Sequence, residues 1–413
     1  MRGQKSGHHY DRYVDHGWIS FKIDLQRMSP RFWMRLGEAR SKCMHLSRVP
    51  LPRDSADRLH VVTLAKGVHA TTAIEGNTLS EEEVLAIVQQ SGRGVDGSYQ
   101  EIEVRNVLDA YNWVLTELRE GRRPVLSPEL IAEFNRRVLD GLQNLPVHVV
   151  PGEYRHDSVV VGPYRAPDWQ ECPELIERLC DWLNGPAFRD DGEQRIPTAI
   201  IRASLAHLYL AWIHPFGDGN GRTARLCEFL VLITSGVPTS AAHLISNYCN
   251  QTRDEYYRQL QYASESGGDV TNFLTYCADG FVIGLEEQLN EIYTRQVRLT
   301  WREFVNDQVT GRDPGMRERR SLIAESLLFL EPVPKQEIAR LTPELAAAYA
   351  RCTPKTLSRD LNELVARNLL LLRPEGYVAN FDVLLGLLPL VVPPEDLPLD
   401  LRQPQPSGEE RSL

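Results

Sequence analysis

One short segment of the chain, 214–225, concentrates residue types that bind phosphates and accept protons. It reads His214-Pro-Phe-Gly-Asp-Gly-Asn-Gly-Arg-Thr-Ala-Arg225, and three of its residues are glycines: Gly217, Gly219 and Gly221. Glycines allow successive backbone N–H groups to point into one concavity, which binds anions. Asp218 is a hard oxygen ligand suited to Mg²⁺ that phosphates also hold. His214 stands at the edge, where a base could reach a hydroxyl that attacks a phosphate.

Two apolar runs flank this segment, at 197–213 and 226–233, and both predict helices. The second helix is expected to start at about Asn220, so its unpaired N–H groups and positive dipole end face the glycine loop. Arg222 and Arg225 are three residues apart and therefore leave the helix from one face. Together these features predict a site for nucleotide phosphates; the alternative is a plain helix–loop–helix turn with solvated arginines.

The segment 214–225 resembles the signature of the Fic family, His-x-Phe-x-Asp/Glu-Gly-Asn-Gly-Arg-x-x-Arg, at every fixed position. That family is mostly helical and typically transfers AMP from ATP to a hydroxyl side chain of a protein. The resemblance implies that His214 is the general base and that Asp218 holds Mg²⁺. It further implies that Asn220, with the Gly219 and Gly221 amides, cradles the α-phosphate. Arg222 would contact the β-phosphate and Arg225 the γ-phosphate, and Phe216 would anchor the loop in the core.

A second informative segment, Thr71-Thr-Ala-Ile-Glu-Gly76, ends a helix predicted over 60–74. Thr71 and Glu75 share one helical face, and Gly76 suits the C′ position. The segment resembles the family's inhibitory motif, Ser/Thr-x-x-x-Glu-Gly/Asn, in the subclass that carries it before the signature. The resemblance implies that Glu75 pairs with Arg225 in place of the γ-phosphate, since carboxylate and phosphate compete for arginine. The alternative is that Glu75 is only a surface carboxylate at a helix end.

The segment 158–164, Ser-Val-Val-Val-Gly-Pro-Tyr, predicts a short β-hairpin. It resembles the Fic flap, which clamps a target segment as an added strand. The flap residues would be Val159, Val160 and Val161. A hairpin with structural duties only is the alternative.

A stretch after the signature, 253–260, resembles the lining of the family's adenine pocket, with Tyr257 as the stacking ring. An aromatic residue at helical spacing is, alternatively, part of a core. Ser264 stands where some relatives have an asparagine that touches the base, which weakens the expectation of adenine relative to that of phosphate.

The bulk properties set limits on the class of protein. The chain has 413 residues, of which 42% are hydrophobic and 25% charged, as expected for a globular protein of two or three domains. Its net charge of −10 argues against nonspecific nucleic-acid binding by the whole chain. Seven scattered cysteines without a CxxC pair predict reduced thiols and a cytoplasmic location. We expect no secretory signal and no membrane contact.

The fold class expected is mostly α: a Fic-type helical core with a short β-hairpin flap, plus a small C-terminal winged helix-turn-helix domain. The expected parts are a helical extension, a catalytic domain with its inhibitory helix near 60–76, a linking helix and linker, a winged-helix-like domain and a Pro-rich tail. Their ranges are 1–55, 56–284, 285–315, 316–385 and 386–413. The boundary is placed at Gly311-Arg-Asp-Pro-Gly315, where turn residues cluster.

The C-terminal part resembles a winged helix-turn-helix because three predicted helices precede a predicted hairpin at 369–379. Its recognition helix would expose Lys355 and Arg359 toward phosphates or base edges of DNA. Asp360 and Glu363 would reduce the positive charge of that face. The alternative is a module for dimerisation or protein contact.

The leading hypothesis is an autoinhibited adenylyltransferase that moves AMP from Mg-ATP to a Tyr, Thr or Ser hydroxyl of a protein, itself included. Glu75 would inhibit the enzyme by pairing with Arg225. A second hypothesis is a DNA-binding regulator that uses the same pocket as a nucleotide sensor. A third is removal of AMP from a modified protein, if Glu75 aligns a water. A homodimer is expected from the family resemblance alone.

Overall fold

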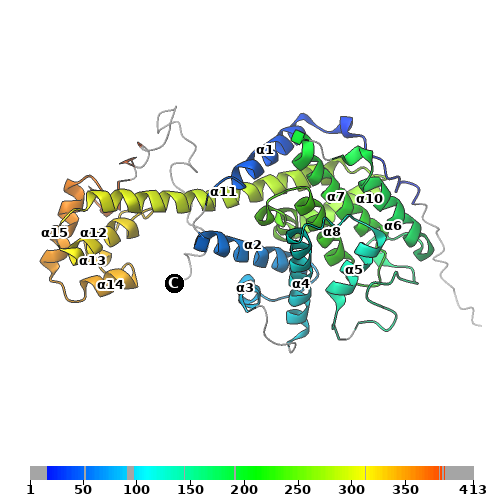
Figure 1. Cartoon of the computed structure of the whole chain (residues 1–413), viewed down its shortest axis with the longest axis horizontal. Helices are drawn as coiled ribbons and strands as arrows, with labels where there is room; N and C mark the ends of the chain where they lie inside the picture. The colour runs from blue at the N-terminus through cyan, green and yellow to red at the C-terminus, as the bar shows by residue number, and fades with distance from the viewer. Residues whose placement is uncertain are drawn as a thin grey trace, which may run out of the picture. The chain divides into compact units, whose positions relative to one another are not determined.

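The computed structural model describes residues 16–50, 53–90, 97–143, 145–189, 192–311, 313–380, 382–383 and 386. The start of the predicted N-terminal extension and nearly all of the predicted Pro-rich tail lie outside these residues. The described chain is mostly helical with two small antiparallel sheets (Figure 1). This confirms the predicted helical class. The chain divides into two compact units, Met1–Glu286 and Glu287–Leu413.

The first unit is built from helices, with a single hairpin among its described residues. The helices are α1 (Pro30–Leu46), α2 (Arg53–Ala73), α3 (Glu81–Gln89), α4 (Tyr99–Arg119), α5 (Pro128–Leu139), α6 (Cys172–Leu183), α7 (Arg195–Ile213), α8 (Asn220–Thr234), α9 (Leu244–Gln251), α10 (Arg253–Glu265) and the start of α11 (Thr271–Gln308). The hairpin pairs β1 (Val160–Val161) with β2 (Tyr164–Arg165). Both the hairpin and the start of α8 at Asn220 confirm predictions from the sequence.

Local sequence explains where several of these helices begin and end. Ser80 and Glu83 form a capping box at the start of α3, and Ser127 caps α5 ahead of Pro128. Helix α2 ends where Gly76 takes a φ of 99°, with its N–H bonded to the Ala73 carbonyl. The next N–H, of Asn77, reaches the Thr72 carbonyl, which completes a Schellman motif. The predicted C′ position of Gly76 is therefore confirmed.

Helices α7 and α8 form the centre of the first unit. Helix α7 packs against α1, α6 and α8, and α8 also contacts α2, α4 and α5. The segment Gly192–Ile213 is long and apolar enough to cross a membrane, but 78% of its most apolar window is buried inside the protein. That burial is typical of a core helix. Because the packed helix α7 ends at Ile213, it fixes where the loop 214–219 begins.

The second unit contains helices α12 (Pro314–Ser326), α13 (Lys335–Ile338), α14 (Pro343–Tyr349) and α15 (Pro354–Ala366), then strands β3 (Leu370–Arg373) and β4 (Gly376–Ala379). The strands pair with Leu370 opposite Ala379. The sequence did not predict α14. The boundary between the units follows Glu286 and so falls within α11, and Trp301 and Val305 of the same helix are buried in the second core. The Trp301 Nε1–H donates to the Ala324 carbonyl at 2.8 Å.

Candidate active site

The signature loop is held in a fixed shape by its own residues. His214 ends α7 in a left-handed conformation with a φ of 47°, and its N–H donates to the Leu210 carbonyl at 2.9 Å. The Asn220 side chain accepts from the Phe216 N–H at 2.9 Å and donates to the Phe216 carbonyl at 2.8 Å. Phe216 is buried, so it anchors the loop to the core. Gly219 precedes α8 with a φ of 75°, a conformation that favours glycine.

Two residues from outside the signature also hold the loop, and the sequence did not identify either. Arg155 is buried and donates from Nε to the His214 carbonyl at 2.8 Å. Its backbone N–H donates to the Pro215 carbonyl at 2.9 Å. Asn135 donates from Nδ2 to the Asp218 carbonyl at 2.8 Å. Because these contacts join distant parts of the chain, no local pattern could reveal them.

The His214 imidazole is suited to accept a proton. Burial lowers its pKa to about 4, although a backbone hydrogen bond opposes the shift. The ring is therefore neutral near pH 7, with one nitrogen free to act as a base.

Arg225 and Glu75 form an ion pair between α8 and the end of α2. Arg225 Nη2 donates to Glu75 Oε1 at 2.5 Å and to the Thr71 carbonyl at 3.0 Å. Burial alone would raise the pKa of Glu75, but the charge of Arg225 outweighs it and holds the pKa below its usual range. Arg225 Nε and Nη1 are buried and have no hydrogen-bond partner among the described residues.

The Glu75 carboxylate also lies against the backbone of Gly221 in the first turn of α8. A Cβ added to Gly221 would collide with Glu75 Oε1. Glu75 is therefore an anion placed at the N-terminus of α8 and beside a buried arginine. Both features attract negative charge, and both would serve a phosphate equally well.

Arg222 joins the signature loop to α4. It donates from Nη1 to Glu103 Oε1 at 2.5 Å and from Nη2 to Asp218 Oδ1 at 3.2 Å. Asn77 donates to Glu103 Oε2 at 3.0 Å. Glu103 was not identified from the sequence. A small cavity of about 200 Å³ lies among these side chains and is open to Asp218.

The residues around Asp218 could hold a divalent cation through one protein carboxylate, with phosphates and water as the other ligands. Among the residues that the structure describes, no group of three or more His, Cys, Asp or Glu side chains could hold a metal ion. The Asp218 carboxylate is partly exposed and faces the small cavity. A single protein carboxylate that leaves the other positions to phosphates and water is how Mg²⁺ is usually held at nucleotides.

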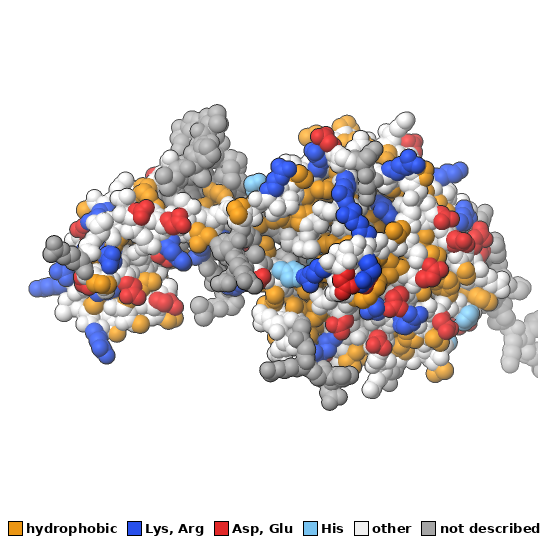
Figure 2. Space-filling model, viewed as in Figure 1, with side chains coloured by type: hydrophobic (Ala, Val, Ile, Leu, Met, Phe, Trp, Pro, Cys, Tyr) orange, Lys and Arg blue, Asp and Glu red, His pale blue; other side chains and the backbone are white. Residues whose placement is uncertain are grey.

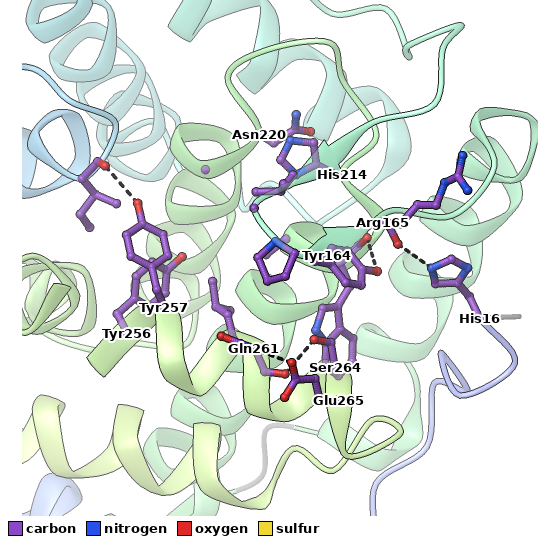
Figure 3. Close-up of a pocket in the computed structure, with 18 of the residues that line it drawn as sticks. His16, Tyr164, Arg165, His214, Asn220, Tyr256, Tyr257, Gln261, Ser264 and Glu265 are labelled. Atoms are coloured by element: carbon purple, nitrogen blue, oxygen red, sulfur yellow. Dashed lines mark hydrogen bonds between the residues drawn. The ribbon is translucent and has the colours of Figure 1, made fainter. Parts of the chain in front are cut away.

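A larger cavity of about 620 Å³ lies along α10 and opens beside the signature loop (Figure 3). Its volume suits a small-molecule ligand. From the expected site it brings together Glu75, Val161, His214, Asn220, Gly221 and Tyr257. The sequence did not identify His16 and Trp18, which also line it.

The other expected residues lie in several places. The Thr71 hydroxyl is hydrogen-bonded to the Tyr111 hydroxyl at 2.9 Å, so only its carbonyl meets Arg225. Val160 and Val161 are exposed on β1, and the Val159 carbonyl accepts from the Ala166 N–H at 3.1 Å. Gly217 packs beside Val149.

Tyr257, Lys355 and Arg359 differ in their relation to the site. Tyr257 is half-exposed in the large cavity, and its hydroxyl donates to the Ile74 carbonyl at 3.3 Å. Lys355 and Arg359 are exposed on α15 in the second unit and line neither cavity.

The fold and site thus define a helical protein in which the start of α8 lines a cavity and the buried Arg225 pairs with Glu75, which lines the same cavity. The family model described as Fic/DOC matches residues 125–232, which include the whole signature loop. The chain therefore contains a Fic domain. This confirms the family suggested by the sequence.

The chain is similar to curated proteins named protein adenylyltransferase. It is 30% identical over 262 residues to fic-1 of Caenorhabditis briggsae, which covers 63% of this chain and 46% of that protein. It is 35% identical over 213 residues to fic-1 of Caenorhabditis elegans, which covers 51% of this chain and 38% of that protein. The chain thus spans less than half the length of these relatives.

Solved structures share the fold. A fragment of Fic-1 from C. elegans aligns with a TM-score of 0.52 and 27% identity, over 64% of this chain and 74% of that one. A Fic family protein from Desulfovibrio desulfuricans G20 aligns with a TM-score of 0.53 over 83% of this chain and 91% of that one. At 19% identity the second likeness shows the fold alone.

Proposed function

We propose that the chain is an autoinhibited protein adenylyltransferase that moves AMP from ATP to a hydroxyl side chain. The observation that carries this proposal is the buried Arg225, whose Nε and Nη1 have no hydrogen-bond partner in the described part of the chain and whose Nη2 meets Glu75 at the N-terminus of α8. An anion site of this kind beside a neutral histidine fits phosphate chemistry. The names of the curated relatives support the same reaction.

The reaction is an in-line displacement at the α-phosphorus. The hydroxyl oxygen of a Tyr, Thr or Ser forms the new P–O bond, and the bond between the α-phosphorus and the bridging oxygen breaks. Pyrophosphate leaves with that oxygen, and the hydroxyl proton goes to His214. Because little covalent work falls on the protein, positioning and electrostatics carry the catalysis. The N-terminus of α8 faces the α-phosphate, and Arg222 and Arg225 face the outer phosphates.

Asp218 is the residue that would hold Mg²⁺. Bound there, the cation would neutralise charge on the phosphates as pyrophosphate departs. The ion pair of Asp218 with Arg222 would keep the carboxylate turned toward the phosphate site, since Arg222 is itself fixed by Glu103.

Glu75 holds this site in an inactive state. It takes one donor of Arg225 and lies where the outer phosphates would sit, so ATP cannot seat productively while the pair is formed. Carboxylate and phosphate both accept charge-assisted hydrogen bonds from arginine, so one displaces the other. Changes that withdraw the end of α2 would relieve the block.

The hairpin supplies the place for the target. Val160 and Val161 are large apolar side chains exposed on a two-residue strand beside the cavity. An extended target segment would add to this edge by main-chain hydrogen bonds and bring its hydroxyl to His214.

Intact-mass spectrometry of purified protein tests the proposal. Glu75→Gly incubated with ATP and Mg²⁺ is expected to gain the mass of AMP, and Glu75→Gly/His214→Ala is not. A screen of cell lysate with ATP labelled at the α-phosphate extends the test to other proteins. If neither self nor lysate proteins are labelled by Glu75→Gly, the proposed transfer is wrong.

A second candidate function, DNA binding by the second unit, is favoured by one observation. Asp360, which the sequence predicted on the exposed face of α15, is instead buried and bound to Arg319 and Arg320. Lys355 and Arg359 therefore stand on an exposed face that Asp360 does not neutralise (Figure 2 shows Lys and Arg side chains projecting from this unit). Such a face fits phosphates.

Salt-dependent binding of duplex DNA tests this candidate. Lys355→Ala/Arg359→Ala should lower both the affinity and the slope of its logarithm against log salt, because phosphate contacts release counterions. Glu375→Ala, at an exposed hairpin turn, is the control. Binding that is absent, or unchanged in the double variant, would remove this candidate.

A further inference from the structure

The segment that precedes α1 contributes to the large cavity, although it lies outside the Fic signature. His16 and Trp18 both line that cavity. His16 Nε2 lies 2.8 Å from the Arg165 carbonyl, and because a carbonyl only accepts, that nitrogen carries the hydrogen (Figure 3). The Trp18 ring meets the Trp212 ring edge-to-face at 4.8 Å. The segment is therefore fixed to β2 and to the end of α7.

The cavity has two distinct ends along α10. At one end Tyr257 contacts the Ile74 carbonyl, next to Glu75 and the phosphate site. Two turns later Ser264 lines the cavity. Ser264 is seven residue steps along the helix from Tyr257, which is about 10 Å at 1.5 Å per residue. Figure 3 shows the labelled side chains of α10 following this direction.

Trp18 lies at the end of the cavity away from the phosphate site. Its carbonyl and ring approach Gly268, just beyond the last turn of α10. Its ring also faces Tyr164 of β2, with centroids 6.4 Å apart. Trp18 is only half-buried, so part of the indole is open to the cavity. A nucleoside whose α-phosphate lies at the N-terminus of α8 would reach this end with its base.

We propose that Trp18 is the wall on which the base of a nucleoside 5′-triphosphate packs, and that it contributes much of the affinity for the nucleoside. This inference rests on the proposed function only in placing the phosphates at α8. An aromatic ring stacked on a base contributes a factor on the order of tenfold or more in affinity. Trp18 is thus a binding residue that determines affinity for the nucleoside and not for the phosphates.

A substitution at Gly268 offers an independent way to displace Trp18 without removing its ring. A Cβ at Gly268 would lie 2.9 Å from the Trp18 carbonyl oxygen and 3.2 Å from its Cε3. Gly268→Ala should therefore displace Trp18. The neighbouring Gly267 also has a positive φ, 73° compared with 87° at Gly268, but a Cβ there would lie within 4 Å of no atom of the residues described. Gly267→Ala is consequently a matched control for backbone strain.

The test is isothermal titration of the full chain, in a Glu75→Gly background, with Mg-ATP and with inorganic tripolyphosphate and Mg²⁺. Trp18→Ala and Gly268→Ala are expected to weaken ATP binding by about tenfold and to leave tripolyphosphate binding within about twofold. Trp18→Phe, which keeps a ring, should retain most of the affinity. Gly267→Ala and Trp33→Ala, an exposed tryptophan of α1, should match the parent.

Two results would overturn the proposal. One is ATP binding by Trp18→Ala that equals the parent's. The other is equal loss of ATP and tripolyphosphate in Trp18→Ala, which would mean that Trp18 only supports the fold. A Glu75→Gly parent that binds ATP but transfers no AMP would contradict the proposed reaction. The role of Trp18 would then still be decided by the ATP and tripolyphosphate titrations. A parent that binds no nucleotide would contradict both.

Discussion

Two buried arginine–carboxylate clusters, one in each compact unit, differ in how completely they are hydrogen-bonded. In the second unit, Asp360 accepts from Arg320 at 2.9 Å, from Arg319 at 3.3 Å and from the Tyr349 hydroxyl at 2.9 Å. In the first unit, Nη2 is the one nitrogen of Arg225 that is hydrogen-bonded to a residue that the structure describes.

The difference separates a structural cluster from a functional one. A buried donor without a partner costs free energy, and a ligand that supplies the missing acceptor would recover it. The Asp360 cluster is closed and joins α12, α14 and α15. The Arg225 cluster is open and lies beside the signature loop. We infer that the unpaired donors of Arg225 bind a phosphate. The donors around Asp360, which are hydrogen-bonded to it, stabilise the fold.

A large effect is expected on AMP transfer at the site beside the open cluster. Replacing His214 by Ala in Glu75→Gly should lower the rate of AMP transfer by about 10²-fold or more, because a positioned base is lost. Glu75→Gly alone should raise the rate above that of the unmodified chain. Initial rates with α-labelled ATP measure both. Transfer that persists in the double variant would remove His214 from its role.

An effect of similar size is expected on stability in the closed cluster. Asp360→Ala should lower the free energy of unfolding of the second unit by about 3 kcal/mol, because Arg320 is left buried without its countercharge. Denaturant unfolding measures it, and nucleotide binding at the first unit should not change. The exposed Glu375→Ala is the control, expected to stay within about 0.5 kcal/mol. An equally small effect of Asp360→Ala would mean that the cluster is not structural.

A smaller effect is expected from the pH dependence of the Glu75 pair. The pKa of Glu75 is lower in the folded chain than in the unfolded chain, where it is about 4.5. Its contribution is therefore complete above pH 4.5 and is lost as the pH falls below that value. Because the side chain is about a third exposed, we expect less than about 1 kcal/mol. The difference in stability between the parent and Glu75→Gln should shrink below pH 4.5; a constant difference would contradict the pair.

The last prediction is that the transfer rate does not change with pH over the range in which an ordinary histidine titrates. With its pKa lowered to about 4 by burial, His214 stays neutral through the range in which an ordinary histidine titrates. The transfer rate of Glu75→Gly should therefore be flat between pH 8 and about pH 5.5 and fall only toward pH 4. A half-maximal rate near pH 6.5, the ordinary histidine value, would show that the base is not buried in the active state.

Local patterns were enough to predict the parts of the site that lie within one stretch of chain. The glycine loop, the start of α8 and the C′ glycine of α2 all follow from neighbouring residues. Residues that act across the fold could not be predicted in this way. Arg155 and Glu103 reach the loop from 59 and 119 residues away, so only packing brings them there.

The prediction for Asp360 failed for a related reason. The position of a carboxylate on a single helix does not show that two arginines of another helix will cover it, as Arg319 and Arg320 of α12 do. The contribution of Trp18 was missed because nothing in the residues around it marks a cavity that α10 and β2 complete.

The most direct test of the open cluster is a crystal structure of Glu75→Gly with Mg²⁺ and ATP. We predict that phosphate oxygens take up the hydrogen-bond donors of Arg225, with the α-phosphate at the N-terminus of α8 and His214 on the side from which a hydroxyl would attack. A nucleotide bound elsewhere, or an Arg225 still without partners at Nε and Nη1 beside bound ATP, would contradict the account.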